Sequence, residues 1–315
     1  MKESGHPNRL YRAGIWCNME GEEVDGRKGD AYMMKNLLFY FSGTGNSLAA
    51  AKAVAGRLGE AELVPLLSAD PGAVWEAETV GIFYPIHMNA TPWSVADFLG
   101  RLRLAGPCHL YGVATHGGLP GKAGCHLRQV LADHGLALSA YFEIEMINNT
   151  PKGVAPRPLM RMDWEKGIGP KDLERMEARL QEGADAIAAA VRARDRESLA
   201  ALDEKARGLG YGIMRLLWKS GGNSKPKLSF LLDEACTGCG ICEKVCTTRR
   251  ISMGSGRPRW AEDNCNYCYA CFNYCPVQAI GVKHYVKKLG RYHHPQVGWR
   301  EIAGQKGGPD PPALR

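Results

Sequence analysis

The chain has 315 residues, of which 45% are hydrophobic and 23% charged, a balance typical of a globular protein with room for two modest domains. It contains no run of about 18 apolar residues, and its N-terminus lacks an apolar core followed by a small-residue cleavage site. We therefore expect neither a membrane span nor a secretory signal. The formal net charge of +7 leaves nucleic acid open as a partner at this stage.

The N-terminal segment is polar, rich in glycine and without periodicity, which predicts a disordered extension over residues 1–34. Met33 and Met34 are alternatives to Met1 as the natural start of the chain. From Asn36 onward the sequence changes to short apolar runs that alternate with helical segments.

Five apolar runs predict β-strands, and the segments between them predict helices. The expected strands cover residues 36–41, 62–66, 79–85, 108–116 and 138–147, and the expected helices cover residues 48–58, 93–104 and 122–135. Thr91 and Pro92 are a suitable N-cap and first residue for the middle helix. Strands and helices in alternation favour the α/β class, with a doubly wound, five-stranded parallel sheet.

A hydroxyl-rich loop joins the first predicted strand to the first predicted helix. It consists of Ser42, Gly43, Thr44, Gly45, Asn46 and Ser47. It does not match the dinucleotide-binding pattern G-x-G-x-x-G, because the last position is Leu48, and no lysine follows as in a nucleoside-triphosphate loop. Backbone N–H groups and neutral hydroxyls at a helix N-terminus can instead bind a monophosphate.

The remainder of the chain divides at a polar linker. A proline-rich loop after the fifth strand is followed by two predicted helices, at residues 170–193 and 196–218, and then by the segment KSGGNSKPK. After the extension, we divide the chain into residues 35–218, 219–227, 228–295 and 296–315. These are an α/β domain with extra C-terminal helices, the linker, a small second domain and a tail.

Eight of the eleven cysteines form two copies of one spacing, C-x₂-C-x₂-C-x₃-C. In bacterial ferredoxins, three cysteines of this spacing hold one [4Fe–4S] cluster and the fourth reaches the other cluster. The two expected ligand sets are Cys236, Cys239, Cys242 and Cys275, and Cys246, Cys265, Cys268 and Cys271. Zinc ribbons need only separated C-x₂-C pairs, and a disulfide framework would require export, so we expect iron–sulfur ligation in a reducing cytoplasm.

The loop at residues 42–47 resembles the flavodoxin phosphate loop, which holds the 5′-phosphate of FMN, and the resemblance extends over residues 35–150 through the order of strands and helices. It implies that the flavin ring lies between the loops after the third and fourth strands. The resemblance assigns to the ring Tyr84, Pro85, Met88, Asn89, Thr115, Gly117 and Gly118. Only Tyr84 is a candidate for an aromatic contact, because Trp93 falls inside a predicted helix.

Residues 230–285 resemble the bacterial two-cluster ferredoxins, which are small α+β domains, with one departure. Pro276 follows Cys275, but Thr247 stands after Cys246, where those ferredoxins often have proline. All eight ligands are present, so the departure bears on the local backbone and the reduction potential, and the expected number of clusters stays two.

The two domains together resemble the EFR-type ferredoxins, which are flavodoxin–ferredoxin fusions found mainly in anaerobes. The segment Arg291 to Pro295 resembles the one that follows the clusters in that family. The resemblance implies electron transfer without naming a substrate, donor or acceptor. It gives no residue a catalytic role.

We therefore expect an intracellular electron-transfer protein that couples two [4Fe–4S] clusters to FMN and serves redox partner proteins. Whether it is an enzyme stays open, since a flavin-dependent reductase fed by its own ferredoxin domain would carry the same motifs. A redox sensor is a weaker alternative. Two clusters add about −4 and a flavin phosphate about −2, which brings the net charge to about +1 and removes the argument for nucleic acid.

Several other polar residues have ordinary interpretations. His87 and His116 lie in the expected flavin loops, and we expect hydrogen-bonded or solvent-facing loop histidines there. Arg249, Arg250, Arg257 and Arg259 lie between the cysteine motifs. We favour a solvated face for these arginines over a docking surface for an acidic redox partner.

Overall fold

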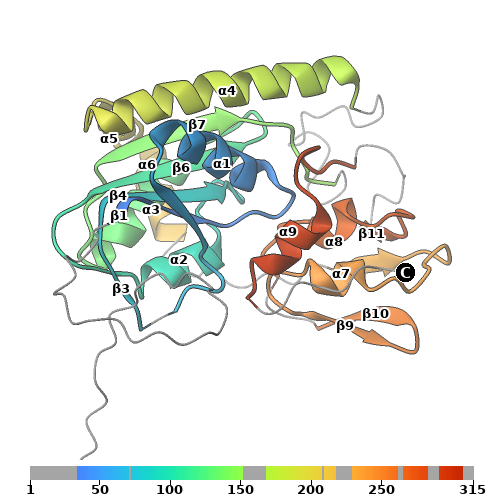
Figure 1. The fold of residues 1–315 in the computed structure, drawn as a ribbon. Helices are drawn as coiled ribbons and strands as arrows, with labels where there is room; N and C mark the ends of the chain where they lie inside the picture. The colour runs from blue at the N-terminus through green and yellow to red at the C-terminus, as the bar shows by residue number, and fades with distance from the viewer. Residues whose placement is uncertain are drawn as a thin grey trace, which may run out of the picture.

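The computed structural model describes residues 34–70, 72–151, 168–207, 209–217, 229–261, 265–282 and 291–307 (Figure 1). The predicted linker lies outside these residues. The predicted disordered extension does too, except for Met34, which begins the first strand.

The N-terminal domain is built on a five-stranded parallel sheet. Its strands are β1 (Met34–Tyr40), β2 (Ala61–Pro65), β4 (Ala77–Pro85), β6 (His109–His116) and β7 (Ala140–Glu145), in the order β2-β1-β4-β6-β7. The central strands are continuous apolar runs because helices cover both faces of the sheet. The predicted doubly wound α/β fold is confirmed, and the strand order is that of flavodoxin-like folds.

Helices lie on both faces of this sheet. They are α1 (Asn46–Leu58), α2 (Trp93–Leu99), α3 (Ala123–Asp133), α4 (Pro170–Arg192), α5 (Ser198–Ala206) and α6 (Leu209–Leu217). Figure 1 shows α1 and α4 above the sheet and α2 and α3 below it, and each of these pairs is in contact. None of the helices in the described ranges combines the length and apolar content that crossing a membrane requires.

Two predicted helices differ from those observed. The helix expected at 93–104 ends at Leu99, and Arg103–Leu104 instead forms β5, a short strand parallel to β3 (Val74–Trp75). The region expected as one helix at 196–218 contains the two helices α5 and α6. The first difference falls at a helix end, where local propensity is weak and tertiary packing decides.

The C-terminal domain is small and of the α+β class, as predicted. Its antiparallel strand pairs are β8 (Phe230–Leu232) with β11 (Ile280–Val282) and β9 (Ile251–Gly254) with β10 (Arg257–Trp260). One-turn helices α7 (Ile241–Lys244) and α8 (Ala270–Asn273) follow the two cysteine loops. Helix α9 (Trp299–Gly304) lies within the segment expected as a tail.

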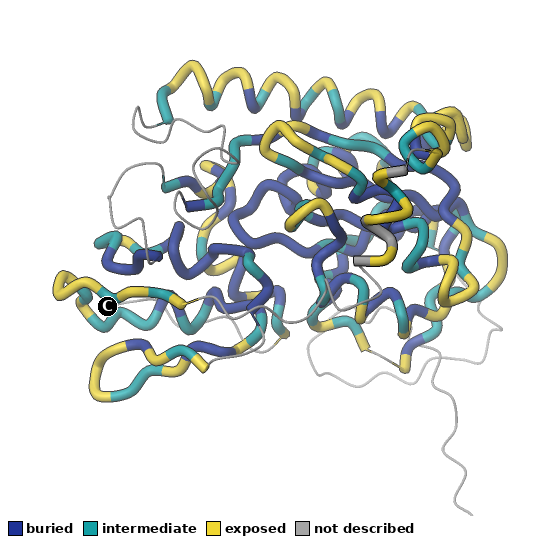
Figure 2. The backbone as a smooth tube through the Cα atoms, turned by 180° about the vertical axis from the view of Figure 1, so that it is seen from behind, coloured by how far each residue is buried: buried dark blue, intermediate teal, exposed yellow. Residues whose placement is uncertain are grey.

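The two domains share one buried apolar core. Phe41 and Leu48 of the N-terminal domain belong to the same cluster of buried side chains as Val245, Tyr274 and Ile302. Figure 2 shows the buried backbone concentrated in the sheet and continuing beyond it, while the outward face of α4 is exposed. Shared burial of this kind stabilises one arrangement of the domains through the hydrophobic effect.

Candidate cofactor sites

The predicted phosphate loop lies between β1 and α1 and turns sharply at Gly45. Gly45 has φ of 99°, a left-handed conformation that glycine adopts without strain, and its N–H donates to Ser42 Oγ at 3.0 Å. Within the described residues, the backbone N–H groups of Gly43, Thr44, Asn46 and Ser47 have no hydrogen-bond partner. Free N–H donors at a helix N-terminus fit an anion such as a phosphate group.

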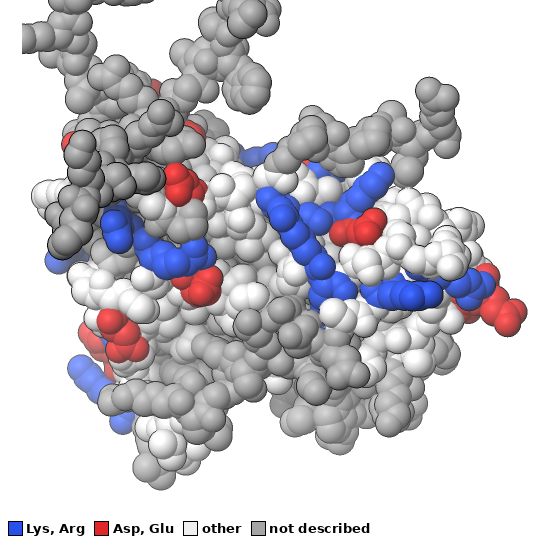
Figure 3. All heavy atoms as spheres, turned by 90° about the horizontal axis from the view of Figure 1, so that it is seen from below, with Lys and Arg blue, Asp and Glu red and all other residues white. Residues whose placement is uncertain are grey.

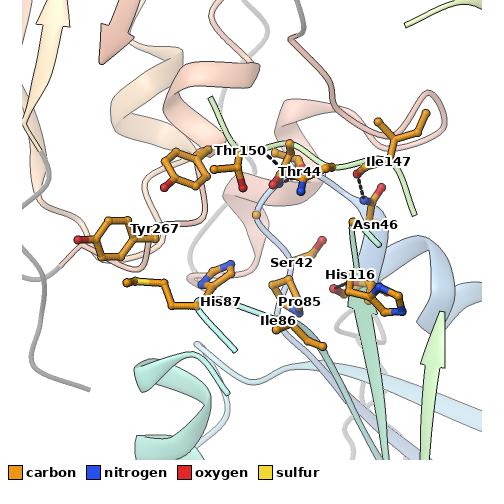
Figure 4. Close-up of a pocket in the computed structure, with 18 residues that line it drawn as sticks. Ser42, Thr44, Asn46, Pro85, Ile86, His87, His116, Ile147, Thr150 and Tyr267 are labelled. Atoms are coloured by element: carbon orange, nitrogen blue, oxygen red, sulfur yellow. Dashed lines mark hydrogen bonds between the residues drawn. The ribbon is translucent and has the colours of Figure 1, made fainter. Parts of the chain in front are cut away.

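A cavity of about 280 Å³ extends from this loop along the carboxyl edge of the sheet (Figure 4). Its lining residues are Ser42, Gly43, Thr44, Asn46, Ser47, Pro85, Ile86, His87, Met88, Thr115, His116, Gly117, Ile147, Asn148, Asn149, Thr150, Tyr267 and Tyr269. None of them carries an acidic or strongly basic side chain, so a phosphate here would be held by neutral donors and the dipole of α1.

The cavity includes most of the residues predicted for FMN. The five phosphate-loop residues other than Gly45 line it, together with Pro85, Met88, Thr115 and Gly117. Gly45, Tyr84, Asn89 and Gly118 are not among the lining residues. The side chain of Tyr84 is fully buried in the core, because β4 is covered on both faces, so it is not available to a ligand in this cavity.

Two parts of the lining were not predicted from the sequence. The first is Ile147–Thr150, the loop after β7; the rule that ligands bind at the carboxyl ends of parallel strands could have indicated it. The second is the pair Tyr267 and Tyr269, which come from the second cysteine loop. No pattern in the sequence distinguishes these tyrosines from other aromatic residues. In Figure 4 Tyr267 lies across the cavity from Asn46 and His116.

The two histidines of the cavity are held neutral near pH 7. Burial lowers the pKa of His87 to about 4, and a hydrogen bond to the backbone of Asn266 opposes the shift. Burial also lowers the pKa of His116, whose Nδ1 accepts the N–H of Gly118 at 3.1 Å. Neither imidazole therefore adds a positive charge to the cavity.

The segment at residues 291–307 fixes the phosphate loop from behind. Gln305, which is fully buried, accepts the N–H of Ser42 and donates to its carbonyl, both at 2.8 Å. The N–H of His294 donates to the carbonyl of Thr44 at 2.8 Å. The hydroxyl of Tyr292 donates to Asn46 Oδ1, also at 2.8 Å. These bonds leave the outward N–H groups of the loop available to a ligand.

The structure places the eight cysteines in two groups. Site 1 denotes Cys236, Cys239, Cys242 and Cys275, which line one small cavity together with Pro276. Site 2 denotes Cys246, Cys265, Cys268 and Cys271. In site 2 the thiols of Cys265 and Cys246 lie close enough to Cys268 to raise its pKa, and the same neighbours act on Cys271.

The chemistry of both sites fits a multinuclear cation. Burial, with smaller contributions from the neighbouring thiols, raises the pKa of Cys242 and of Cys268 to about 12. Buried sulfurs gathered in this way become thiolates when a metal centre compensates their charge. In the described part of the chain, no three His, Cys, Asp or Glu side chains gather closely enough to hold a single metal ion, and none of the cysteines there forms a disulfide. A cubane holds its thiolates further apart than one zinc ion does.

Site 2 lies directly against the phosphate loop. A Cβ atom placed on Gly43 would lie 2.4 Å from the carbonyl oxygen of Cys268, so only glycine allows the two loops to approach this closely. Trp93 Nε1 donates to the carbonyl of Cys265 at 3.1 Å. The flavodoxin-like cavity and site 2 therefore share a wall.

Comparison with known proteins gives one family match and several similar solved structures. A family model described as a 4Fe-4S binding domain matches residues 258–281. No curated protein matches the chain. Similar solved structures include a metal-soaked flavodiiron core from Synechocystis, with 15% identity, a TM-score of 0.33, and coverage of 50% of this chain and 37% of that one. A flavodoxin from the domain Archaea has 12% identity, a TM-score of 0.30, and coverage of 49% and 99%.

A third similar structure is the rubredoxin oxygen:oxidoreductase from the anaerobe Desulfovibrio gigas, with 17% identity, a TM-score of 0.31, and coverage of 50% and 37%. This chain thus spans little more than a third of that enzyme and of the flavodiiron core. The sheet order and the family match together define a flavodoxin-like domain joined to a 4Fe–4S binding domain, with at least one [4Fe–4S] cluster.

Proposed function

We propose that this protein transfers electrons between two [4Fe–4S] clusters, one at each cysteine site, and an FMN in the cavity. When bound, the clusters supply one-electron chemistry and the flavin supplies one- or two-electron chemistry. The observation that carries the proposal is the wall shared by site 2 and the cavity, formed by Tyr267 and Tyr269. We also propose that the chain is a member of the EFR-type ferredoxins.

The packing supports a fixed path between the cofactors. Electron transfer slows steeply with distance, so a protein that couples two redox centres must hold them close together. Here the cysteine loop that carries Cys268 touches the phosphate loop at Gly43, and the buried core continues from one domain into the other. No acid, base or nucleophile is needed for such a transfer.

The outer face of the C-terminal domain offers a surface on which a redox partner protein could dock near site 1. The site 1 loop contacts the β9–β10 turn at Gly238 and Gly256, and Arg257 and Arg259 on β10 are exposed. Figure 3 shows lysine and arginine side chains gathered on the face seen from below, with acidic side chains among them. The exposure of Arg257 and Arg259 agrees with the solvated face expected from the sequence, and the same positive charge would attract an acidic redox protein as the partner of site 1. Arg250, in contrast, is buried and donates to the carbonyl of Ala261.

The decisive experiment counts the cofactors and then follows an electron between them. Protein purified without oxygen is expected to contain about eight iron and eight sulfide per chain and one FMN released by acid. After photochemical reduction of the clusters, the flavin absorbance should change at a rate independent of protein concentration. Eight iron with no flavin bound even after FMN is added would refute the coupling, and a rate proportional to protein concentration would refute the internal path.

The phosphate loop can be tested by the double substitution Thr44→Ala and Ser47→Ala. A hydrogen bond to a charged group contributes about 1.5–3 kcal/mol, so each hydroxyl lost from the phosphate should raise the Kd for FMN about 10- to 100-fold without changing the iron content. Ser68→Ala removes an exposed hydroxyl elsewhere and is the matched control. Unchanged flavin affinity in the double variant would show that the loop does not hold the phosphate.

One observation favours a second function, a flavin-dependent reductase. Met88 lines the cavity and its side chain is 76% exposed, so the cavity reaches the surface there. A small electron acceptor could enter by this route. Catalytic turnover with a diffusible acceptor in the absence of any partner protein would favour the reductase over the carrier.

A further inference from the structure

Site 2 has hydroxyl groups beside its sulfurs. Thr247 Oγ1 lies 3.5 Å from Cys268 Sγ, and both residues are buried. A cysteine sulfur that binds iron carries no proton, so the hydroxyl must be the donor in this pair. Thr248 Oγ1 lies 3.7 Å from Cys246 Sγ.

The surroundings of Thr247 fix its orientation. Asn266 Nδ2 donates to Thr247 Oγ1 at 3.2 Å, and Asn266 is also buried. Since one lone pair of the hydroxyl oxygen receives this bond, its own proton is free to point at Cys268. The result is a buried chain of donors from Asn266 through Thr247 to a ligand of site 2.

Among the residues that the structure describes, site 1 has no corresponding hydroxyl group. Pro276 occupies the position after Cys275 that Thr247 occupies after Cys246, and it lines the site 1 cavity. The only hydroxyl side chain in that lining is Thr237, which is exposed and has no hydrogen bond to sulfur among the described residues. The sulfur contacts of site 1 include a backbone donor, the N–H of Ala279 to Cys275 Sγ at 3.2 Å.

A positive charge also favours site 2. Lys306 is partly buried, and its Nζ donates to the carbonyl of Glu243 at 3.2 Å. This ammonium group interacts electrostatically with Cys246 and Cys268, both in site 2. The described residues that line the site 1 cavity include no charged side chain. Hydrogen bonds to sulfur and nearby positive charge both stabilise the reduced, more negative form of a cluster.

We propose that Thr247 raises the reduction potential of the site 2 cluster above that of the site 1 cluster. It acts as a positioning residue, through its hydrogen bond to Cys268 Sγ. The proposal rests on the proposed function, in that it requires both clusters. When one electron moves from site 1 to site 2, the site 1 cluster loses that electron and the site 2 cluster gains it. No bond is formed or broken, and no proton moves. The electron then resides beside the cavity, where the transfer to FMN takes place.

The test is an anaerobic redox titration of the holoprotein, followed by electron paramagnetic resonance. Thr247→Val should lower the higher of the two cluster potentials. We expect about a tenfold loss in the equilibrium constant for reducing that cluster, which is about 59 mV for a one-electron couple. Thr247→Ser keeps the hydroxyl and should retain the wild-type potential. Thr237→Val makes the same chemical change at site 1 and should leave both potentials unchanged.

A second variant keeps the test valid if Thr247→Val fails to assemble its clusters. Thr247→Pro introduces the residue that follows Cys275 in site 1 and should lower the same potential as Thr247→Val. Unchanged potentials in both variants, or an equal shift in Thr247→Ser, would overturn the proposal. In either case, eight iron and rapid flavin reduction would leave the proposed function intact. Conversely, a shifted potential in a protein whose flavin is not reduced would refute the proposed function and retain the role of Thr247.

Discussion

Gly43 is the residue at which the phosphate loop touches the second cysteine loop, and Gly43→Ala is expected to force the two loops apart. The added Cβ would lie 2.4 Å from the carbonyl oxygen of Cys268 and 2.7 Å from its Cβ. Ordinary contacts begin at 3.4 Å, so the loops must separate by about 1 Å. The atom in the way is a backbone oxygen, which cannot move aside by a change of rotamer.

The expected cost follows from this geometry. Overpacking in a well-packed interior typically destabilises by about 1–3 kcal/mol. Urea unfolding under anaerobic conditions measures this loss, and flavin titration measures whether the shifted loop binds FMN more weakly. We expect lower stability, weaker FMN binding and slower reduction of the flavin by the clusters, with the iron content unchanged.

Gly56→Ala is the matched control. Gly56 lies in α1, and no atom lies within 4 Å of the position its Cβ would take. Alanine in a helix interior is about 0.5–1 kcal/mol more favourable than glycine, so this variant should be slightly stabilised. If Gly43→Ala proves as stable as Gly56→Ala and binds FMN as tightly as the wild type, the contact between the loops is wrong, and the packing argument for a fixed path between the cofactors fails with it.

Two further predictions concern buried polar groups. Gln305→Leu leaves the buried N–H and carbonyl of Ser42 without partners, so urea unfolding should show a loss of about 2–5 kcal/mol, whereas Gln296→Leu on the exposed part of the same segment should show little change. His126 is buried, its Nδ1 accepts the N–H of Thr91 at 3.1 Å, and burial lowers its pKa to about 4, below the ordinary value of 6.5. The unfolded chain then binds more protons than the folded chain below pH 6.5, so stability should fall as the pH drops from about 6.5 to 4, by about 3 kcal/mol at most. His126→Gln should flatten this part of the pH profile, and an equally steep profile in both proteins would contradict the assignment.

The main features of the fold could be predicted from sequence because they depend on local patterns. Five apolar runs in alternation with helices were enough to predict the parallel sheet. The spacing of the eight cysteines is a local pattern of the same kind, and the ligand sets drawn from it stay a prediction. The phosphate loop has a similarly local origin, since its glycines and hydroxyls are contiguous.

The parts that could not be predicted depend on contacts between distant segments. Tyr267 and Tyr269 line the cavity only because the C-terminal domain packs against the sheet edge, and nothing near them in the sequence indicates that packing. Tyr84 was expected to contact the flavin ring because it lies at the end of β4, next to a predicted ring loop. Helices cover both faces of β4, so the side chain of Tyr84 is buried in the core instead. The segment expected as a tail holds Gln305, whose partner Ser42 is 263 residues away.

The bonds between Gln305 and Ser42 have a consequence for biosynthesis. A ribosome releases the phosphate loop long before it has translated residue 305, so the nascent N-terminal domain must wait for the second domain before this loop is fixed. Because site 2 packs against the same loop, cluster insertion should help to shape the flavin pocket. Under the proposed function, FMN is then expected to be acquired last, after translation and iron–sulfur assembly.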